Sequence, residues 1–94
     1  TEENITLSPG KYSRYGNITA KSNYITNLGA NSSQLSLPPW NNGIYTEINV
    51  LKPIPNVVKS TVAPWAAWGG VGGGTQYMLP ISIIQLKNLG YLIF

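Results

Sequence analysis

Five of the chain's ten glycines fall within residues 69–74. Trp65 and Trp68 precede this run, and Gln76 and Tyr77 follow it. A flexible linker would carry serine, asparagine or charged residues on its flanks rather than bulky apolar ones. Glycines in such surroundings indicate backbone that is held close to a neighbour, at dihedral angles that only glycine adopts at low cost. That neighbour is either another part of the fold or a ligand.

The chain contains neither cysteine nor histidine, and this excludes several kinds of chemistry. No disulfide or thiolate metal site can form, and the commonest metal ligand and general base are missing, so we expect no metal ion. Ser-His and Cys-His catalytic arrangements are excluded for the same reason. Acidic groups are scarce as well. Glu2 and Glu3 belong to a polar lead-in at residues 1–8, which leaves Glu47 as the only acidic side chain in the body of the domain.

Length and charge limit the partners of the chain. Its 94 residues form one domain spanning residues 1–94, with a net charge of +3. The six cations are scattered, which suits a small anionic ligand or an acidic protein better than a nucleic acid. They are Lys11, Arg14, Lys21, Lys52, Lys59 and Lys87. No apolar run approaches the roughly 20 residues of a spanning helix, so we expect no membrane anchor in this domain. Because the chain begins at Thr1 rather than methionine, we expect it to be part of a larger protein.

The clearest strand pattern covers residues 44–51, where side chains alternate with a period of two. The set expected to face the core comprises Ile44, Thr46, Ile48 and Val50, and the opposite set comprises Tyr45, Glu47 and Asn49. Pro53 and Pro55 are expected to end this strand. Further short strands are predicted at residues 57–63, 75–79 and 91–94 and within 11–36.

A single helix is predicted at about residues 81–89. Pro80 and Ser82 are typical of a helix start, and Gly90 is typical of the left-handed residue after a helix end. The isoleucines in this segment are also compatible with a strand. The sequence therefore predicts an α+β fold that is mostly β, with a small twisted antiparallel sheet or sheets and one short C-terminal helix.

Several short motifs occur in an order that points to a known family. In sequence order they are Arg14-Tyr15-Gly16, Leu37-Pro38-Pro39, Lys52-Pro53-Ile54-Pro55, Val62-Ala63-Pro64-Trp65 and Gly72-Gly73-Gly74-Thr75-Gln76-Tyr77. Over residues 9–94 this order resembles the glycohydrolase domain of the tuberculosis necrotizing toxin (TNT) family. The stretch from residue 62 to residue 77 is its most specific part.

The resemblance implies a toxin domain at the C-terminus of a large secreted or contact-delivered bacterial protein, although some fungal surface proteins are related. Such domains cleave the nicotinamide–ribose bond of NAD+ or NADP+ in the cytoplasm of the target cell, and so deplete its dinucleotide pool. The dinucleotide is then the substrate, and no cofactor is expected. A dedicated immunity protein that covers the active site is the expected protein partner.

The resemblance also implies roles for individual residues. The family arginine falls on Arg14, which would bind the pyrophosphate, and the next family aromatic falls on Tyr24. The family glutamine falls on Gln76. Two positions depart from the family pattern. Leu35 follows Gln34 where an arginine is usual, and Thr46 stands where a histidine is frequent. These departures leave open a divergent subgroup with ADP-ribosyl cyclase activity.

The expected chemistry needs little acid catalysis, because nicotinamide leaves as a neutral molecule. The site must instead stabilise an oxocarbenium-like ribose and control the access of water. We expect Gln76 and Glu47 at the ribose as catalytic groups together with Arg14. The expected substrate contacts further include Tyr24, Tyr45, Thr46, Trp68, Gly74 and Thr75. Trp65 is expected in the core.

Less specific interpretations remain for these residues. Gln76 could cap a turn, Arg14 could be a surface residue, and Glu47 could lie on a solvated strand face. The alternative functions are a catalytically degenerate NAD-binding module of the same fold and, less favoured, a ribonuclease toxin.

Overall fold

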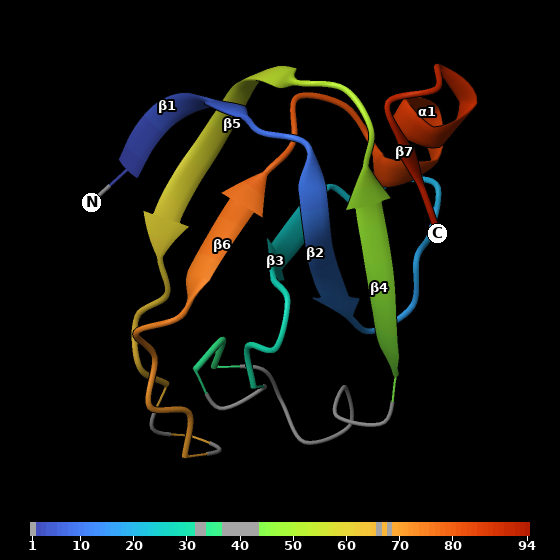
Figure 1. Cartoon of the computed structure of the whole chain (residues 1–94). Helices are drawn as coiled ribbons and strands as arrows, with labels where there is room; N and C mark the ends of the chain where they lie inside the picture. The colour runs from blue at the N-terminus through green and yellow to red at the C-terminus, as the bar shows by residue number, and fades with distance from the viewer. Residues whose placement is uncertain (1, 32–33, 37–43, 66, 68) are drawn as a thin grey trace.

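The computed structural model describes residues 2–31, 34–36, 44–65, 67 and 69–94 (Figure 1). The described residues form one antiparallel sheet of seven strands, ordered β1-β5-β6-β3-β2-β4-β7, and one helix. The elements are β1 (Glu2–Leu7), β2 (Gly10–Tyr15), β3 (Tyr24–Asn27), β4 (Tyr45–Val50), β5 (Ile54–Thr61), β6 (Thr75–Met78), α1 (Ile83–Asn88) and β7 (Leu92–Ile93). The predicted fold class is confirmed. In the part of the chain that the structure describes, no helix is long and apolar enough to cross a membrane.

Two local expectations differ from the structure. Residues 1–8 were expected to form a lead-in, yet residues 2–7 form β1, which pairs with β5 along most of its length. The sequence of β1 has no alternating apolar pattern that would predict a strand, because β1 lies at an edge of the sheet where most of its side chains are exposed. The strand predicted at 57–63 begins earlier, at Ile54, and includes Pro55. Pro55 is tolerated there because it lies where the pairing register with β1 shifts, so no ladder hydrogen bond needs its nitrogen.

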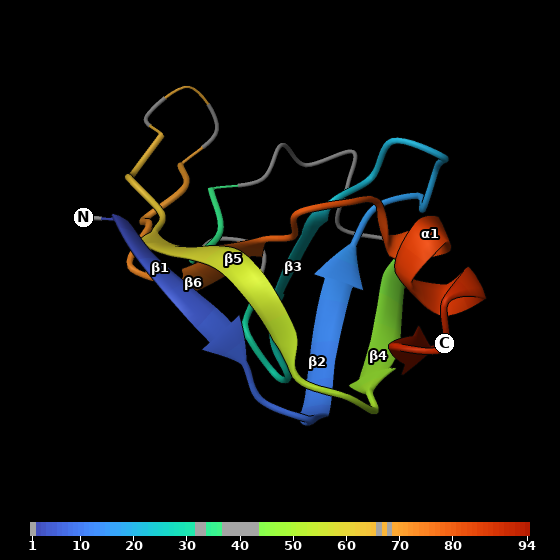
Figure 2. The ribbon, with the colours of Figure 1, turned by 90° about the horizontal axis from the view of Figure 1, so that it is seen from above.

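The sheet must curl, because the chain passes from β1 to β2 through only Ser8 and Pro9. In the sheet order these two strands are separated by β5, β6 and β3. In a flat sheet they would lie about 19 Å apart, since neighbouring strands are spaced by about 4.8 Å. Three peptide steps reach only about 11 Å. Figure 2 shows the resulting curve, with the chain running directly from the end of β1 to the start of β2.

The core lies on the inner face of this curve. Cross-strand partners share a face of the sheet, and the pairs Tyr12–Ile48 and Ile25–Tyr77 lie on this one. Tyr12 and Tyr77 stand two strands apart, yet their rings meet edge to face with centroids 5.6 Å apart. The buried apolar residues are Leu7, Ile25, Ile48, Val50, Ile54, Val57, Tyr77, Leu79, Ile83, Leu86 and Leu92.

Helix α1 closes one end of this core. Ser82 is its N-cap, and Ser82 and Gln85 form a reciprocal capping box. Gly90 adopts the left-handed conformation expected after the helix end, with φ of 83°. The amide of Ile83 donates to the carbonyl of Ser22 at 2.8 Å, which ties the helix to the β2–β3 connection.

The neighbour of the glycine run is the chain itself. Gly73 and Gly74 exchange main-chain hydrogen bonds with Val62, and the amide of Gly74 also donates to the carbonyl of Gln34 at 3.0 Å. A Cβ atom on Gly72 would lie 2.6 Å from the nitrogen of Pro64. The run therefore extends the β5–β6 hairpin and packs against backbone on both sides.

Trp65 lies in this extension rather than in the core. Its amide and carbonyl pair with those of Gly70, and its side chain is 54% exposed. The expectation that Trp65 is buried was wrong, because the hairpin carries this residue beyond the end of the sheet.

We predict that Gly72→Ala destabilises the fold more than Gly73→Ala. Both glycines have positive φ, so each substitution carries a conformational cost of about 1–2 kcal/mol. Only at Gly72 would the new methyl group also collide with backbone, whereas nothing lies within 4 Å at Gly73. Urea unfolding of both variants measures the difference. Equal losses would show that the close packing at Gly72 contributes nothing.

We also predict that stability falls as pH rises beyond about 10, the usual pKa of tyrosine. Burial, followed by the neighbouring Tyr77, raises the pKa of Tyr12 in the folded state. The unfolded chain therefore loses this proton first, so the stabilisation is complete below pH 10 and is lost above it. Unfolding in urea across this range should show a shallower loss in Tyr12→Phe than in the wild type. An identical pH dependence in the two proteins would show that Tyr12 does not cause the loss of stability at high pH.

Candidate functional site

A small pocket opens where β2, β3 and β6 meet the segment 34–36. Its volume is about 70 Å³. It is lined by Arg14, Tyr15, Tyr24, Ile25, Thr26, Leu35 and Gln76. Three of the predicted site residues, Arg14, Tyr24 and Gln76, therefore come together, although they lie on three different strands.

The pairing register places a row of polar residues across the outer face of the sheet. From β5 to β4 the directly opposed residues are Ser60, Gln76, Thr26, Ser13 and Glu47. Gln76 and Glu47 thus share a face but stand three strands apart, a Cα separation of roughly 14 Å. Gln76 lines the pocket and Glu47 does not, so the structure does not place these two predicted residues in one pocket.

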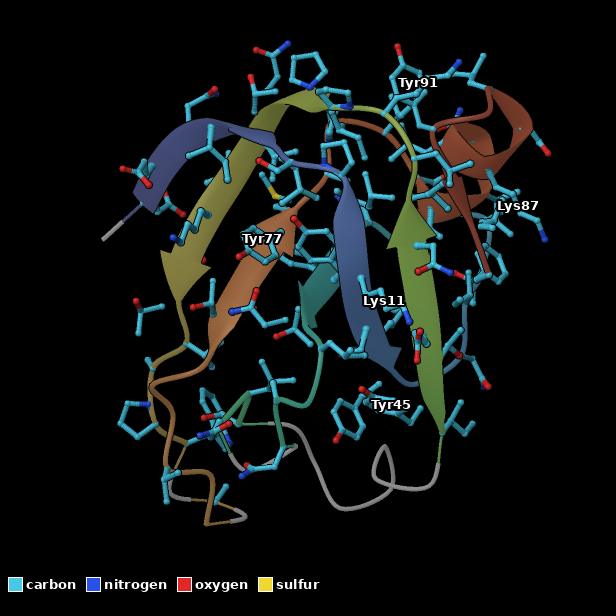
Figure 3. All side chains as sticks on the ribbon, in the orientation of Figure 1. Lys11, Tyr45, Tyr77, Lys87 and Tyr91 are labelled. Carbon is cyan, nitrogen blue, oxygen red and sulfur yellow. The ribbon has the colours of Figure 1, made fainter. Side chains whose placement is uncertain are left out.

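Glu47 instead has a partner on the neighbouring strand. Its carboxylate lies 3.7 Å from the ammonium group of Lys11, and both side chains are largely exposed. Figure 3 shows Lys11 on the β2–β4 side of the sheet. Glu47 does not line the pocket. The alternative reading, a residue on an open strand face, describes its surroundings better.

Gln76 lies at a well-anchored position on β6. It is half-buried and stands directly opposite Thr26 of β3. Thr26 is buried, and its hydroxyl donates to the main-chain carbonyl of Thr75 at 2.5 Å. Neither Thr75 nor Gly74 lines the pocket, but the amide of Gly74 donates to the carbonyl of Gln34, the residue before Leu35 in the pocket wall.

Arg14 is committed to the fold by all three guanidinium nitrogens. Nη1 donates to the carbonyl of Tyr24 at 2.9 Å, and Nη2 donates to the carbonyl of Asn17 at 3.0 Å and to Ser22 Oγ at 3.2 Å. Nε donates to Asn17 as well. Burial lowers the pKa of this guanidinium, although an arginine stays protonated at neutral pH. Arg14 therefore gives the pocket a positive charge while it holds the β2–β3 connection in place.

Two tyrosines hold the loop that leads to the pocket wall. The rings of Tyr15 and Tyr45 meet at 5.1 Å between centroids, and the Tyr15 hydroxyl donates to the carbonyl of Ala30 at 2.9 Å. The amide of Gly29 donates to the Tyr45 hydroxyl at 3.2 Å. Tyr45, labelled in Figure 3, supports the loop and contacts the ring of Tyr15, and it is not part of the pocket lining.

The structure treats the three remaining predicted substrate contacts differently. Tyr24 lines the pocket and is partly exposed, with its hydroxyl 3.3 Å from the sulfur of Met78. Thr46 stands opposite Arg14 in the β2–β4 pair but does not line the pocket. Trp68 lies outside the described residues.

Sequence reasoning missed four lining residues, namely Tyr15, Ile25, Thr26 and Leu35. Two of them carried a signal. Tyr15 belongs to the Arg-Tyr-Gly motif, and Leu35 had been noted as a departure from the family pattern. Thr26 had no signal of its own, because its place opposite Gln76 depends on the pairing of β3 with β6.

A second hollow of about 300 Å³ lies at the β1 edge. It is lined by Glu2, Glu3, Lys59, Ser60 and Thr61. It contains none of the predicted site residues. Its size alone does not make it the better candidate, because its charged residues Glu2, Glu3 and Lys59 belong to none of the motifs that carry the family resemblance.

Comparison with known proteins supports the family assignment. A family model described as tuberculosis necrotizing toxin matches residues 6–93, which is nearly the whole chain. The search of curated proteins found no match.

We predict that Arg14→Lys destabilises the fold by about 1–3 kcal/mol, because an ammonium group cannot replace the forked hydrogen bonds to Asn17, Tyr24 and Ser22. The matched control is Lys11→Met. It should change the free energy of unfolding by less than about 1 kcal/mol, since its ion pair with Glu47 is exposed. Urea unfolding measures both. Wild-type stability in Arg14→Lys would contradict the conclusion that Arg14 holds the β2–β3 connection in place.

Proposed function

The chain belongs to the tuberculosis necrotizing toxin family of toxin domains, and we propose that it is an NAD+ glycohydrolase. The observation that carries the proposal is the convergence of Arg14, Tyr24 and Gln76 on one pocket. These residues come from three separate segments of the sequence, and the family resemblance assigns each of them to the substrate.

In the proposed reaction, the bond between C1′ of the ribose and the pyridinium nitrogen breaks, and its electron pair neutralises the nicotinamide ring. Positive charge is then shared by C1′ and the ribose ring oxygen. Water adds to C1′ and releases a proton to the solvent, which yields ADP-ribose and nicotinamide. If a nitrogen of the adenine adds in place of water, the product is cyclic ADP-ribose. No step requires a histidine or a metal ion.

The pocket residues suit this chemistry. The amide oxygen of Gln76 can face the developing positive charge or accept hydrogen bonds from the ribose hydroxyls. Tyr15 and Tyr24 offer aromatic surface for the nicotinamide ring. Arg14 supplies positive charge for the pyrophosphate, which it can exert through space while its nitrogens hold the main chain.

The size of the pocket limits what it holds. Pockets for whole drug-sized ligands usually measure about 300–1,000 Å³, whereas this one measures about 70 Å³. We therefore propose that it receives only the nicotinamide end of the dinucleotide and that the remainder lies across the adjoining surface.

The biological setting is proposed on the same basis. The domain would be delivered as part of a larger protein and would act in the cytoplasm of the target cell without a cofactor. An immunity protein that covers the pocket formed by Arg14, Tyr24 and Gln76 would neutralise it.

The second candidate is a binding module that has lost its activity. Leu35 in the pocket wall favours it, because an apolar residue there cannot hold a phosphate. Calorimetry separates the two functions: such a module binds NAD+ and releases no product. A ribonuclease is less favoured because the six cations are scattered along the sequence.

The decisive experiment incubates the purified domain with NAD+ and follows nicotinamide release. We predict that Gln76→Ala lowers kcat by about 100-fold or more, as expected when a group that stabilises transition-state charge is lost. Ser60→Ala is the matched control, since Ser60 stands opposite Gln76 on β5 but outside the pocket. Its kcat should equal that of the wild type.

Two outcomes would refute the proposal, namely no nicotinamide release by micromolar enzyme or full turnover in Gln76→Ala. Chromatography of the products separates ADP-ribose from cyclic ADP-ribose, and repeating the assay with NADP+ gives the dinucleotide preference. Glu47→Gln tests whether Glu47 takes part. Unchanged turnover in this variant would leave Gln76 as the group at the ribose.

A further inference from the structure

We infer that Thr26 is a positioning residue that fixes the orientation of Gln76 through the peptide unit preceding it. This inference rests on the proposed function. Thr26 is 3% exposed, and its hydroxyl donates to the carbonyl oxygen of Thr75 at 2.5 Å. That carbonyl and the amide nitrogen of Gln76 belong to one planar peptide unit. A hydrogen bond to the carbonyl therefore restrains the plane from which the Gln76 side chain projects.

The restraint acts at the end of the pairing between β3 and β6. On the β3 side the paired residues are Tyr24 with Met78, Ile25 with Tyr77 and Thr26 with Gln76, so Gln76 is the last residue of this ladder. Thr75 is paired with Thr61 on the β5 side. The Thr26 hydroxyl adds a side-chain hydrogen bond from β3 to the carbonyl of Thr75 at this end of the ladder.

The chain just before this point is rich in glycine and is held by main-chain hydrogen bonds of Gly73 and Gly74 to Val62 and Gln34. Gly72 and Gly73 adopt positive φ values, and Gly74 connects them to the first residue of β6. Glycine has the largest conformational freedom of any residue. The Thr26 hydroxyl adds to these main-chain bonds a restraint on the peptide unit that directly precedes Gln76. A misplacement of about 1 Å can cost an enzyme as much as 100-fold in rate.

The donor direction of Thr26 also matters. Because its proton is committed to Thr75, the hydroxyl has no proton left for a substrate. Thr26 lines the pocket, but its role in the reaction is exerted through Gln76.

Ser13 provides a matched control on the neighbouring strand. It is fully buried in the same row, and its hydroxyl donates to the main-chain carbonyl of Asn27 at 2.9 Å. This is the same kind of hydrogen bond, one strand further from Gln76, and Ser13 does not line the pocket. Loss of either hydroxyl should lower stability, but only loss of the Thr26 hydroxyl should disturb Gln76.

The test compares Thr26→Val, Thr26→Ser and Ser13→Ala with the wild type. Valine keeps the shape of threonine without its hydroxyl, so kcat for NAD+ should fall by about 10- to 100-fold while KM stays unchanged. Serine restores the donor and should restore kcat. Ser13→Ala should keep the wild-type kcat even where its melting temperature drops.

A second measurement does not depend on turnover. In NMR spectra, Thr26→Val should lower the backbone order parameters of Thr75 and Gln76, whereas Thr26→Ser and Ser13→Ala should leave them as in the wild type. Unchanged order parameters and kcat in Thr26→Val would overturn the inference, as would a failure of Thr26→Ser to restore kcat or an equal kcat loss in Ser13→Ala. If the wild type releases no nicotinamide, the proposed function fails, and the order parameters still decide whether Thr26 positions Gln76.

Discussion

The two-residue connection between β1 and β2 sets the shape of the whole molecule. Ser8 and Pro9 join an edge strand to a strand four places away, which a flat sheet cannot accommodate. The curl that results brings Tyr12 and Tyr77 into contact on the inner face. The outer face carries short polar side chains, among them Ser13 and Thr26. The Ser13 hydroxyl donates to the main-chain carbonyl of Asn27 on β3, and the Thr26 hydroxyl donates to that of Thr75 on β6.

The pocket wall depends on backbone that is packed against backbone. Gly74 binds the carbonyl of Gln34, and a Cβ atom on Gly70 would lie 2.7 Å from Cα of Ser36. The segment 34–36 is also held by the Ser36 hydroxyl, which donates to the carbonyl of Ala63 at 2.6 Å. Leu35 lies between these attachments and lines the pocket. The glycine run thus shapes the site indirectly, through the segment it supports.

Local patterns in the sequence predicted the elements that form by short-range rules. The alternation at residues 44–51 gave β4, and Ser82 with Gly90 marked the helix. Strand order could not be predicted, because it depends on long-range pairing, and the separation of Glu47 from Gln76 follows from that order. The edge strand β1 was missed because exposed strands lack an apolar pattern. For the site, the motifs predicted Arg14, Tyr24 and Gln76. Thr26 could not be predicted, because its place beside Gln76 depends on the pairing of β3 with β6.

The clamping of Arg14 has a practical consequence for anyone who needs a harmless form of this domain. A substitution at Arg14 removes a pocket charge and loosens the β2–β3 connection at once, so an inactive product could simply be misfolded. The side chain of Gln76 has no comparable set of bonds to the main chain among the described residues. An attenuated protein that keeps its surface for antibody production or for isolating a neutralising partner should therefore be made at Gln76.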